Sequence, residues 1–124
     1  MFMRFAVPEI HEGSRRPQGV FAAAYALLDA GRLDAEEERA LREVLGWFNE
    51  HLASPEYFVA RRAVFWFKAA AREQVRRAWG LVCLLRLHGL HVEVYKCRRL
   101  ANVVYEDRDQ VAAYSSPKDG RVTR

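Results

Sequence analysis

The strongest constraint on the fold is a change of hydrophobic period at Gly89. Before this glycine, apolar residues recur at helical spacing, whereas after it they alternate with polar residues. A period near 3.6 residues is typical of an amphipathic helix, and a period of two is typical of a half-buried strand. The chain therefore combines a helical region with a following β region, which predicts the α+β class.

The first half of the chain predicts two helices. The first covers residues 20–28, and Gly31 stands where a left-handed C-terminal cap would lie. Asp34 and Glu37 have the spacing of a capping box, so a second helix should start there. Because few residues separate the two helices, we expect them to form an antiparallel hairpin.

More helix is predicted in the middle of the chain. Ser54-Pro55 is a helix-start signal, and the main helix is expected over residues 68–88, ending at Gly89. The segment Val64–Phe67 is apolar on every side and fits either a buried strand or the entry to this helix. We favour the helix entry.

A short strand is predicted at the N-terminus. It covers Phe2–Val7 and should stop at Pro8, because proline has no N–H to donate to a sheet. The polar stretch Glu9–Gly19 then forms a loop.

Three further strands are predicted near the C-terminus. They cover residues 90–95, 101–105 and 110–114, and Asp107–Asp109 supplies the turn between the last two. The expected fold is an N-terminal strand, about three helices including the hairpin, and a three-stranded antiparallel meander, in one sheet with the helices on one face. We expect one domain over residues 1–114 and a flexible tail over 115–124.

Charge is distributed unevenly along the chain. Residues 1–60 carry six Arg and ten acidic residues, for a net charge of −4, whereas residues 61–124 carry fourteen Lys or Arg and six acidic residues, for +8. Such asymmetry between halves indicates a charged macromolecular partner.

The basic residues provide one candidate site. If Lys68, Arg72 and Arg76 lie on one helix, their i, i+4 spacing places them in a row, and Arg61-Arg62 precede that row. A row of cations is what the phosphates of a nucleic acid require. The alternative is an ordinary solvated helix edge.

Tryptophans provide a second candidate site. Trp47 lies beside the apolar stripe of the second helix rather than within it, and Trp66 belongs to an aromatic cluster. Either indole would serve as an anchor for a protein partner. The alternative is that these rings belong to the core.

The sequence gives little support for a metal site or for catalysis. Cys83, His88, His91 and Cys97 are zinc-ligand types, but their spacing lacks the short Cys-x2-Cys knuckle, and Cys83 is expected in the core. Acid–base pairs are conceivable at His11-Glu12, at His91 with Glu93, and in the acidic turn at residues 106–109. We therefore expect no metal and no cofactor, and an enzyme is the least favoured function.

The longest apolar run has nine residues, far short of the roughly 20 that cross a membrane, and no signal-peptide core is present. We expect a small cytoplasmic protein of bacterial type that acts as a binding, adaptor or regulatory module. Its expected partner is another protein or a second copy of itself, without membrane association. A nucleic-acid-binding protein is the first alternative and a small enzyme with a His/acid site is the second.

Overall fold

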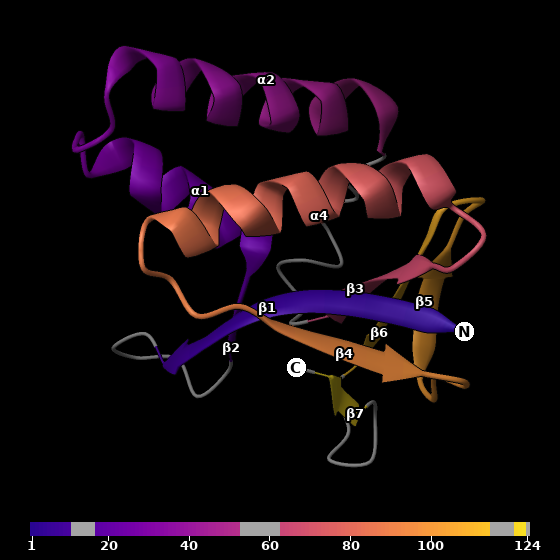
Figure 1. The fold of residues 1–124 in the computed structure, drawn as a ribbon. Coiled ribbons are helices and arrows are strands. Elements are labelled where there is room, and N and C mark those ends of the chain that lie inside the picture. Colours follow the sequence, from indigo (N-terminus) through magenta and orange to yellow (C-terminus); the bar gives the residue numbers. More distant parts are fainter. Residues whose placement is uncertain (11–16, 53–62, 115–120, 124) are drawn as a thin grey trace.

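The computed structural model describes residues 1–10, 17–52, 63–114 and 121–123. In this part of the chain, three helices lie on one side of a seven-stranded sheet (Figure 1). All of the strand pairings are antiparallel. The predicted α+β class, with helices on one face of an antiparallel sheet, is confirmed, although the sheet has more strands than the predicted N-terminal strand and three-stranded meander.

The helical hairpin forms as predicted from α1 (Val20–Asp29) and α2 (Ala35–His51). Gly31 adopts the left-handed conformation expected of a residue after a helix, with φ of 68°. The capping box is present, because the Asp34 carboxylate accepts from the Glu37 N–H at 2.8 Å and the Glu37 carboxylate accepts from the Asp34 N–H at 3.0 Å.

Residues Ala63–Lys68 form strand β3, so the helix-entry prediction for this segment is wrong. The strand pairs from Ala63 to Phe67 with β6 (Gln110–Tyr114), and its buried side chains lie on both sides of the sheet. Aromatic and β-branched residues suit a strand that is covered on both faces, and this tertiary context outweighs local helical preference.

The third described helix, α4, covers Arg72–Leu87. It begins later than predicted, because Lys68 ends β3 and Ala69-Ala70 form a turn. Its end agrees with the prediction, since Gly89 has a φ of 82°. No helix among the described residues is long and apolar enough to cross a membrane.

The sheet does not contain the predicted three-stranded meander. Its strand order is β5-β6-β3-β1-β4-β7, with β2 paired to β1. Of the three strands predicted for the meander, only β5 and β6 pair with each other. Strand β4 lies on the far side of β1, because β1 and β3 lie between β4 and β6. The strands other than β3 are β1 (Phe2–Ile10), β2 (Pro17–Gly19), β4 (Glu93–Cys97), β5 (Val103–Glu106), β6 (Gln110–Tyr114) and β7 (Arg121–Thr123).

The N-terminal strand continues past Pro8, where we expected it to stop. The register between β1 and β2 shifts between Val7 and Ile10, so the proline lies at an irregularity of the ladder. Part of the predicted loop over 9–19 is therefore a β1–β2 pairing. Residues 121–123, expected in a tail, pair with β4.

The main core lies between the helices and the sheet. In Figure 1, α2 is the helix farthest from the sheet, and it contacts both α1 and α4. Even so, the Phe48 ring reaches the sheet, with its centroid 6.0 Å from that of Phe67. On the other face of the sheet, Trp66 and Val111 are also buried. Both faces of the central strands are therefore covered.

Candidate functional site

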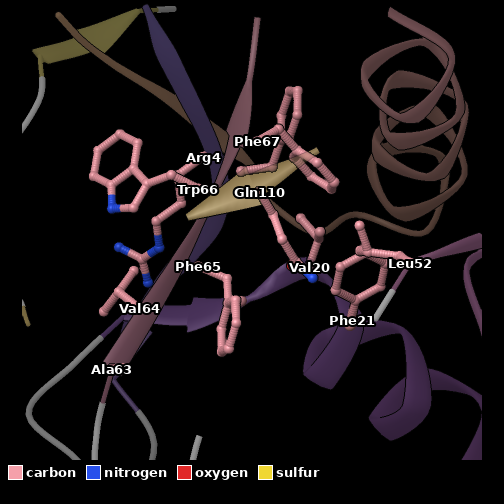
Figure 2. Close-up of a pocket in the computed structure, with 12 residues that line it drawn as sticks. Arg4, Val20, Phe21, Leu52, Ala63, Val64, Phe65, Trp66, Phe67 and Gln110 are labelled. Atoms are coloured by element: carbon pink, nitrogen blue, oxygen red, sulfur yellow. The ribbon is translucent and has the colours of Figure 1, made fainter. Parts of the chain in front are cut away.

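A gap between two strands of the sheet creates the candidate site. Within the described residues, β3 pairs with β1 only at Phe2 and Met3. Further along β1, Ala6 pairs with Glu93 of β4 and with Gly19 of β2, so β2 takes the edge that β3 has left. A cavity of about 270 Å³ opens where the strands diverge, against the first turn of α1 (Figure 2).

Apolar side chains form most of the cavity wall. Figure 2 shows Phe21 and Leu52 on the helix side of β3, with Trp66 and the Arg4 guanidinium on the opposite side. The cavity therefore reaches both faces of the sheet through the gap. Its described lining consists of Arg4, Phe5, Gly19, Val20, Phe21, Leu52, Ala63, Val64, Phe65, Trp66, Phe67 and Gln110.

Gln110 is the buried polar residue of the wall, and the β5–β6 turn fixes it. Its side-chain amide donates to Asp107 Oδ2 at 3.2 Å, and its backbone N–H donates to Asp107 Oδ1 at 2.9 Å. The Tyr105 hydroxyl donates to the same carboxylate at 2.7 Å, and the Asp109 N–H donates to it at 2.8 Å. One carboxylate thus holds both the turn and one side of the cavity.

These contacts shift two pKa values. Burial acts to raise the pKa of Asp107, but hydrogen bonds from the Tyr105 hydroxyl and from backbone N–H groups outweigh it, so the pKa lies below its ordinary value. The hydrogen bond to Asp107, followed by burial, raises the pKa of Tyr105. The acidic turn predicted as a candidate acid–base group is therefore a hydrogen-bonded structural element.

The other polar residue of the wall, Arg4, adjoins a second polar cluster. Its guanidinium carbon lies 5.8 Å from the centre of the Tyr95 ring. The Tyr95 hydroxyl donates to Glu93 at 3.0 Å, and His91 Nε2 lies 3.3 Å from the other oxygen of that buried carboxylate. The predicted His91–Glu93 pair forms, but neither residue belongs to the described cavity lining.

This lining suits binding better than proton transfer. Arg4 is the only ionisable residue among the described lining residues, and an arginine stays protonated in a protein. The volume is just below the roughly 300 Å³ at which sites for small molecules and cofactors begin. The cavity therefore has room for one large side chain or a small apolar molecule.

The predicted tryptophan anchors occupy different places. Trp66 is buried, with 4% of its surface exposed, and lines the cavity. Trp47 is half-buried between α2 and α4, with the His51 ring stacked 4.4 Å away and the Arg77 guanidinium carbon 4.9 Å from its ring centre.

The predicted row of cations does not form, because Lys68 lies in β3 and not in a helix with Arg72 and Arg76. The Lys68 ammonium pairs with Glu106 at 2.6 Å, and the Arg76 guanidinium pairs with Glu73 at 2.6 Å. Arg72 is exposed and makes no ion pair among the described residues.

Glu73 neutralises two cations at once. Hydrogen bonds from Arg76 and then from Arg77 lower its pKa to about 2. The same hydrogen bond to Glu73 raises the pKa of Arg76. This surface of α4 is therefore a mixed-charge network and not a purely basic one.

The four candidate zinc ligands are not brought together. No group of three or more metal-ligating side chains occurs among the residues that the structure describes. Cys83 is exposed on α4, which corrects its expected core position, because Leu81, Val82 and Leu85 take the buried side of the helix. The His88 imidazole contacts Glu37 at 2.9 Å and so links α4 to the start of α2.

Some predicted features lie outside the described residues. They are Arg61, Arg62, His11-Glu12 and the helix start at Ser54-Pro55. Conversely, three residues that line the cavity, Arg4, Phe21 and Gln110, were not predicted as site residues. No signal in the sequence indicated them, because they meet only once residues 63–68 form a strand.

Comparison with known proteins identifies no relative. No protein-family model, no curated protein and no solved structure matches the chain.

Proposed function

We propose that this protein is a binding module of the adaptor or regulatory kind, and that its cavity receives a large apolar side chain of a protein partner. The observation that carries the proposal is an aromatic cavity whose only described ionisable residue is Arg4. Binding hot spots are apolar or aromatic anchors that fill such pockets, surrounded by contacts that exclude water.

The surroundings of the cavity support a preformed pocket. Phe67 is held in the core by the rings of Phe5, Phe21 and Phe48, and Gln110 is held by its turn. Rigid walls lose little freedom when they bind, which favours affinity.

The nucleic-acid alternative has less support. Lys68 and Arg76, two of the residues predicted to hold phosphates, already have carboxylate partners. Phosphates would have to compete with these ion pairs. A role for Arg61 and Arg62 stays a prediction.

Side-chain analogues test the cavity directly. We would titrate toluene, p-cresol and 3-methylindole into the labelled protein and follow amide and indole N–H shifts by NMR. Millimolar ligand should shift the Val20 amide and the Trp66 indole N–H. The variant Ala63→Phe fills the cavity and should lose these shifts, whereas Ala26→Phe, at an exposed position of α1, should keep them.

A second step tests the partner class. A peptide selected from a displayed library against the wild-type protein should bind Ala63→Phe at least tenfold more weakly and Ala26→Phe equally well. The proposal fails if no analogue shifts the cavity residues, or if Ala63→Phe leaves the shifts and the peptide affinity unchanged.

A further inference from the structure

The wall of the cavity contains a guanidinium that a purely apolar anchor does not need. Arg4 is the only ionisable residue of the described lining, so this part of the wall carries a positive charge and no negative one. We infer that the occupant is the C-terminal residue of a protein partner, whose aromatic side chain fills the cavity and whose terminal carboxylate binds Arg4. This inference rests on the proposed function and adds the chemical identity of the anchor residue.

The alternation of side chains along β1 places Arg4 on the face of the sheet opposite the helices. Its neighbours in the strand, Met3 and Phe5, pack into the core under the helices, so Arg4 points the other way. Figure 2 shows the guanidinium on the same side of β3 as Val64 and Trp66. Both of these side chains are buried. The charge therefore lies beside an apolar surface, where its attraction for a carboxylate is screened less than in open water.

Neighbouring groups hold the guanidinium in place. Its central carbon lies 5.8 Å from the centre of the Tyr95 ring, within the range at which a cation and an aromatic ring attract each other. The Tyr95 hydroxyl donates to Glu93 at 3.0 Å, and His91 lies 3.3 Å from the other oxygen of this buried carboxylate. Because the ring under Arg4 is itself fixed, the guanidinium loses little freedom when it binds a ligand.

A guanidinium can bind a ligand in addition to its contacts within the protein. It has five N–H donors in a planar fork, and a bidentate contact with one carboxylate takes two of them. Arg4 can therefore keep its internal contacts and also donate to a carboxylate in the cavity.

The size of the cavity favours a carboxylate that belongs to the same residue as the ring. A volume of about 270 Å³ has room for one large side chain, and an adjacent acidic residue would bring a second side chain into the same space. A C-terminal residue carries its carboxylate on its own Cα. The half-buried rings of Phe21 and Phe65 border the cavity on the helix side of β3. A ligand in the gap between β1 and β3 thus meets aromatic rings at one end and the cation at the other.

Two peptides that differ only in the terminal group test the carboxylate contact. The probes are acetyl-Gly-Ser-Gly-Phe with a free terminal carboxylate and the same peptide as its C-terminal amide. Both are titrated into the labelled full chain at low ionic strength, and the shift of the Trp66 indole N–H gives the two dissociation constants. The acid should bind about five- to tenfold more tightly than the amide, because a hydrogen bond to a charged group has roughly this value.

Variants of Arg4 locate the contact, with the acid-to-amide ratio within each variant as the readout. Binding of the amide reports any change in the cavity itself, so the ratio isolates the charge. Arg4→Met removes the cation and should abolish the preference for the acid. Arg4→Lys keeps the charge without the fork and should keep part of the preference. Arg72→Met is the matched control, because Arg72 is an exposed cation outside the described lining, and it should leave the ratio unchanged.

Two further probes separate other occupants. Acetyl-Gly-Phe-Asp-Gly-amide has an internal ring beside an acidic side chain, and it should bind more weakly than the acid peptide. The free acid 3-phenylpropionate has the ring and the carboxylate without a peptide, and its binding should also depend on Arg4.

Four results would overturn the inference. They are equal binding of the acid and the amide to the wild type, an unchanged preference in Arg4→Met, equal binding of the internal-Phe peptide, and binding of 3-phenylpropionate without binding of the acid peptide. If the apolar side-chain analogues shift the cavity residues and the acid shows no preference, the terminal carboxylate is wrong and the proposed function stands. If no probe binds, the proposed function fails as well.

Discussion

Trp47 connects two helices, so its removal gives a direct measure of how the helical layer is held together. The indole packs edge-on against Phe48 with ring centroids 5.1 Å apart and stacks on His51. The Arg77 guanidinium from α4 covers the ring at 4.9 Å. Substitution of Trp47 by Ala removes all three contacts at once.

The magnitude follows from these contacts. Complete removal of a buried Trp lowers the free energy of unfolding by about 3–5 kcal/mol. Trp47 is only half-buried, which reduces this to about 2 kcal/mol, and loss of the Arg77 contact adds about 0.5–1 kcal/mol. For a domain of this size, the total of about 2.5–3 kcal/mol lowers the melting temperature by roughly 10 °C.

Thermal and urea denaturation followed by circular dichroism measures the effect. Trp47→Phe should lose about half as much stability, because a ring remains between the helices. A double-mutant cycle with Arg77→Gln should give a coupling energy of about 0.5–1 kcal/mol. If Trp47→Ala melts within about 2 °C of the wild type, the reasoning is refuted and the indole is free to serve as the partner anchor that the sequence predicted.

Two further predictions concern the turn and the basic residues. Asp107→Asn should lower the free energy of unfolding at pH 7 by about 2 kcal/mol, because the carboxylate accepts four hydrogen bonds. Since folding lowers the pKa of Asp107, its contribution is present above about pH 4 and lost as the pH falls through the folded-state value, so the variant should show a smaller acid-side loss in denaturation curves. Unchanged stability at pH 7 would contradict this, and Asp29→Asn is the exposed control. In fluorescence anisotropy, a labelled oligonucleotide should bind weakly at low salt and Arg72→Glu should change little. Micromolar binding that falls steeply with salt and is abolished by Arg72→Glu would instead support the nucleic-acid function.

Local sequence signals predicted the helical hairpin and the end of α4. The Asp34–Glu37 capping box starts α2 as predicted, and Gly31 and Gly89 follow their helices with positive φ. Each of these signals depends on interactions between residues at most about four positions apart, so it can be recognised in the sequence without knowledge of the tertiary structure. The β5–β6 hairpin was also predicted correctly, because its turn is stabilised locally: the Asp107 carboxylate accepts hydrogen bonds from the backbone N–H groups of Asp109 and Gln110.

Long-range pairing had no such signal. The segment Val64–Phe67 is apolar on every side, and periodicity cannot distinguish a buried strand from a buried helix entry. Residues 63–68 form a strand because they pair with β6 on one side and with β1 on the other. The same pairing removed Lys68 from the predicted cation row and gave it Glu106 as a partner.

Hydrophobic period and capping groups were enough to predict the α+β class, the helical hairpin and the end of the main helix before Gly89, because these signals are local. Tertiary structure alone decided the strand order, the divergence of β3 from β1 and the cavity that results. A cavity is bounded by residues far apart in the chain, here Arg4, Phe21 and Gln110, and its existence depends on where two strands stop pairing. On one edge of β1, β3 pairs at Phe2 and Met3, and β2 pairs from Ala6 onward. Local sequence patterns do not predict where one neighbouring strand replaces the other.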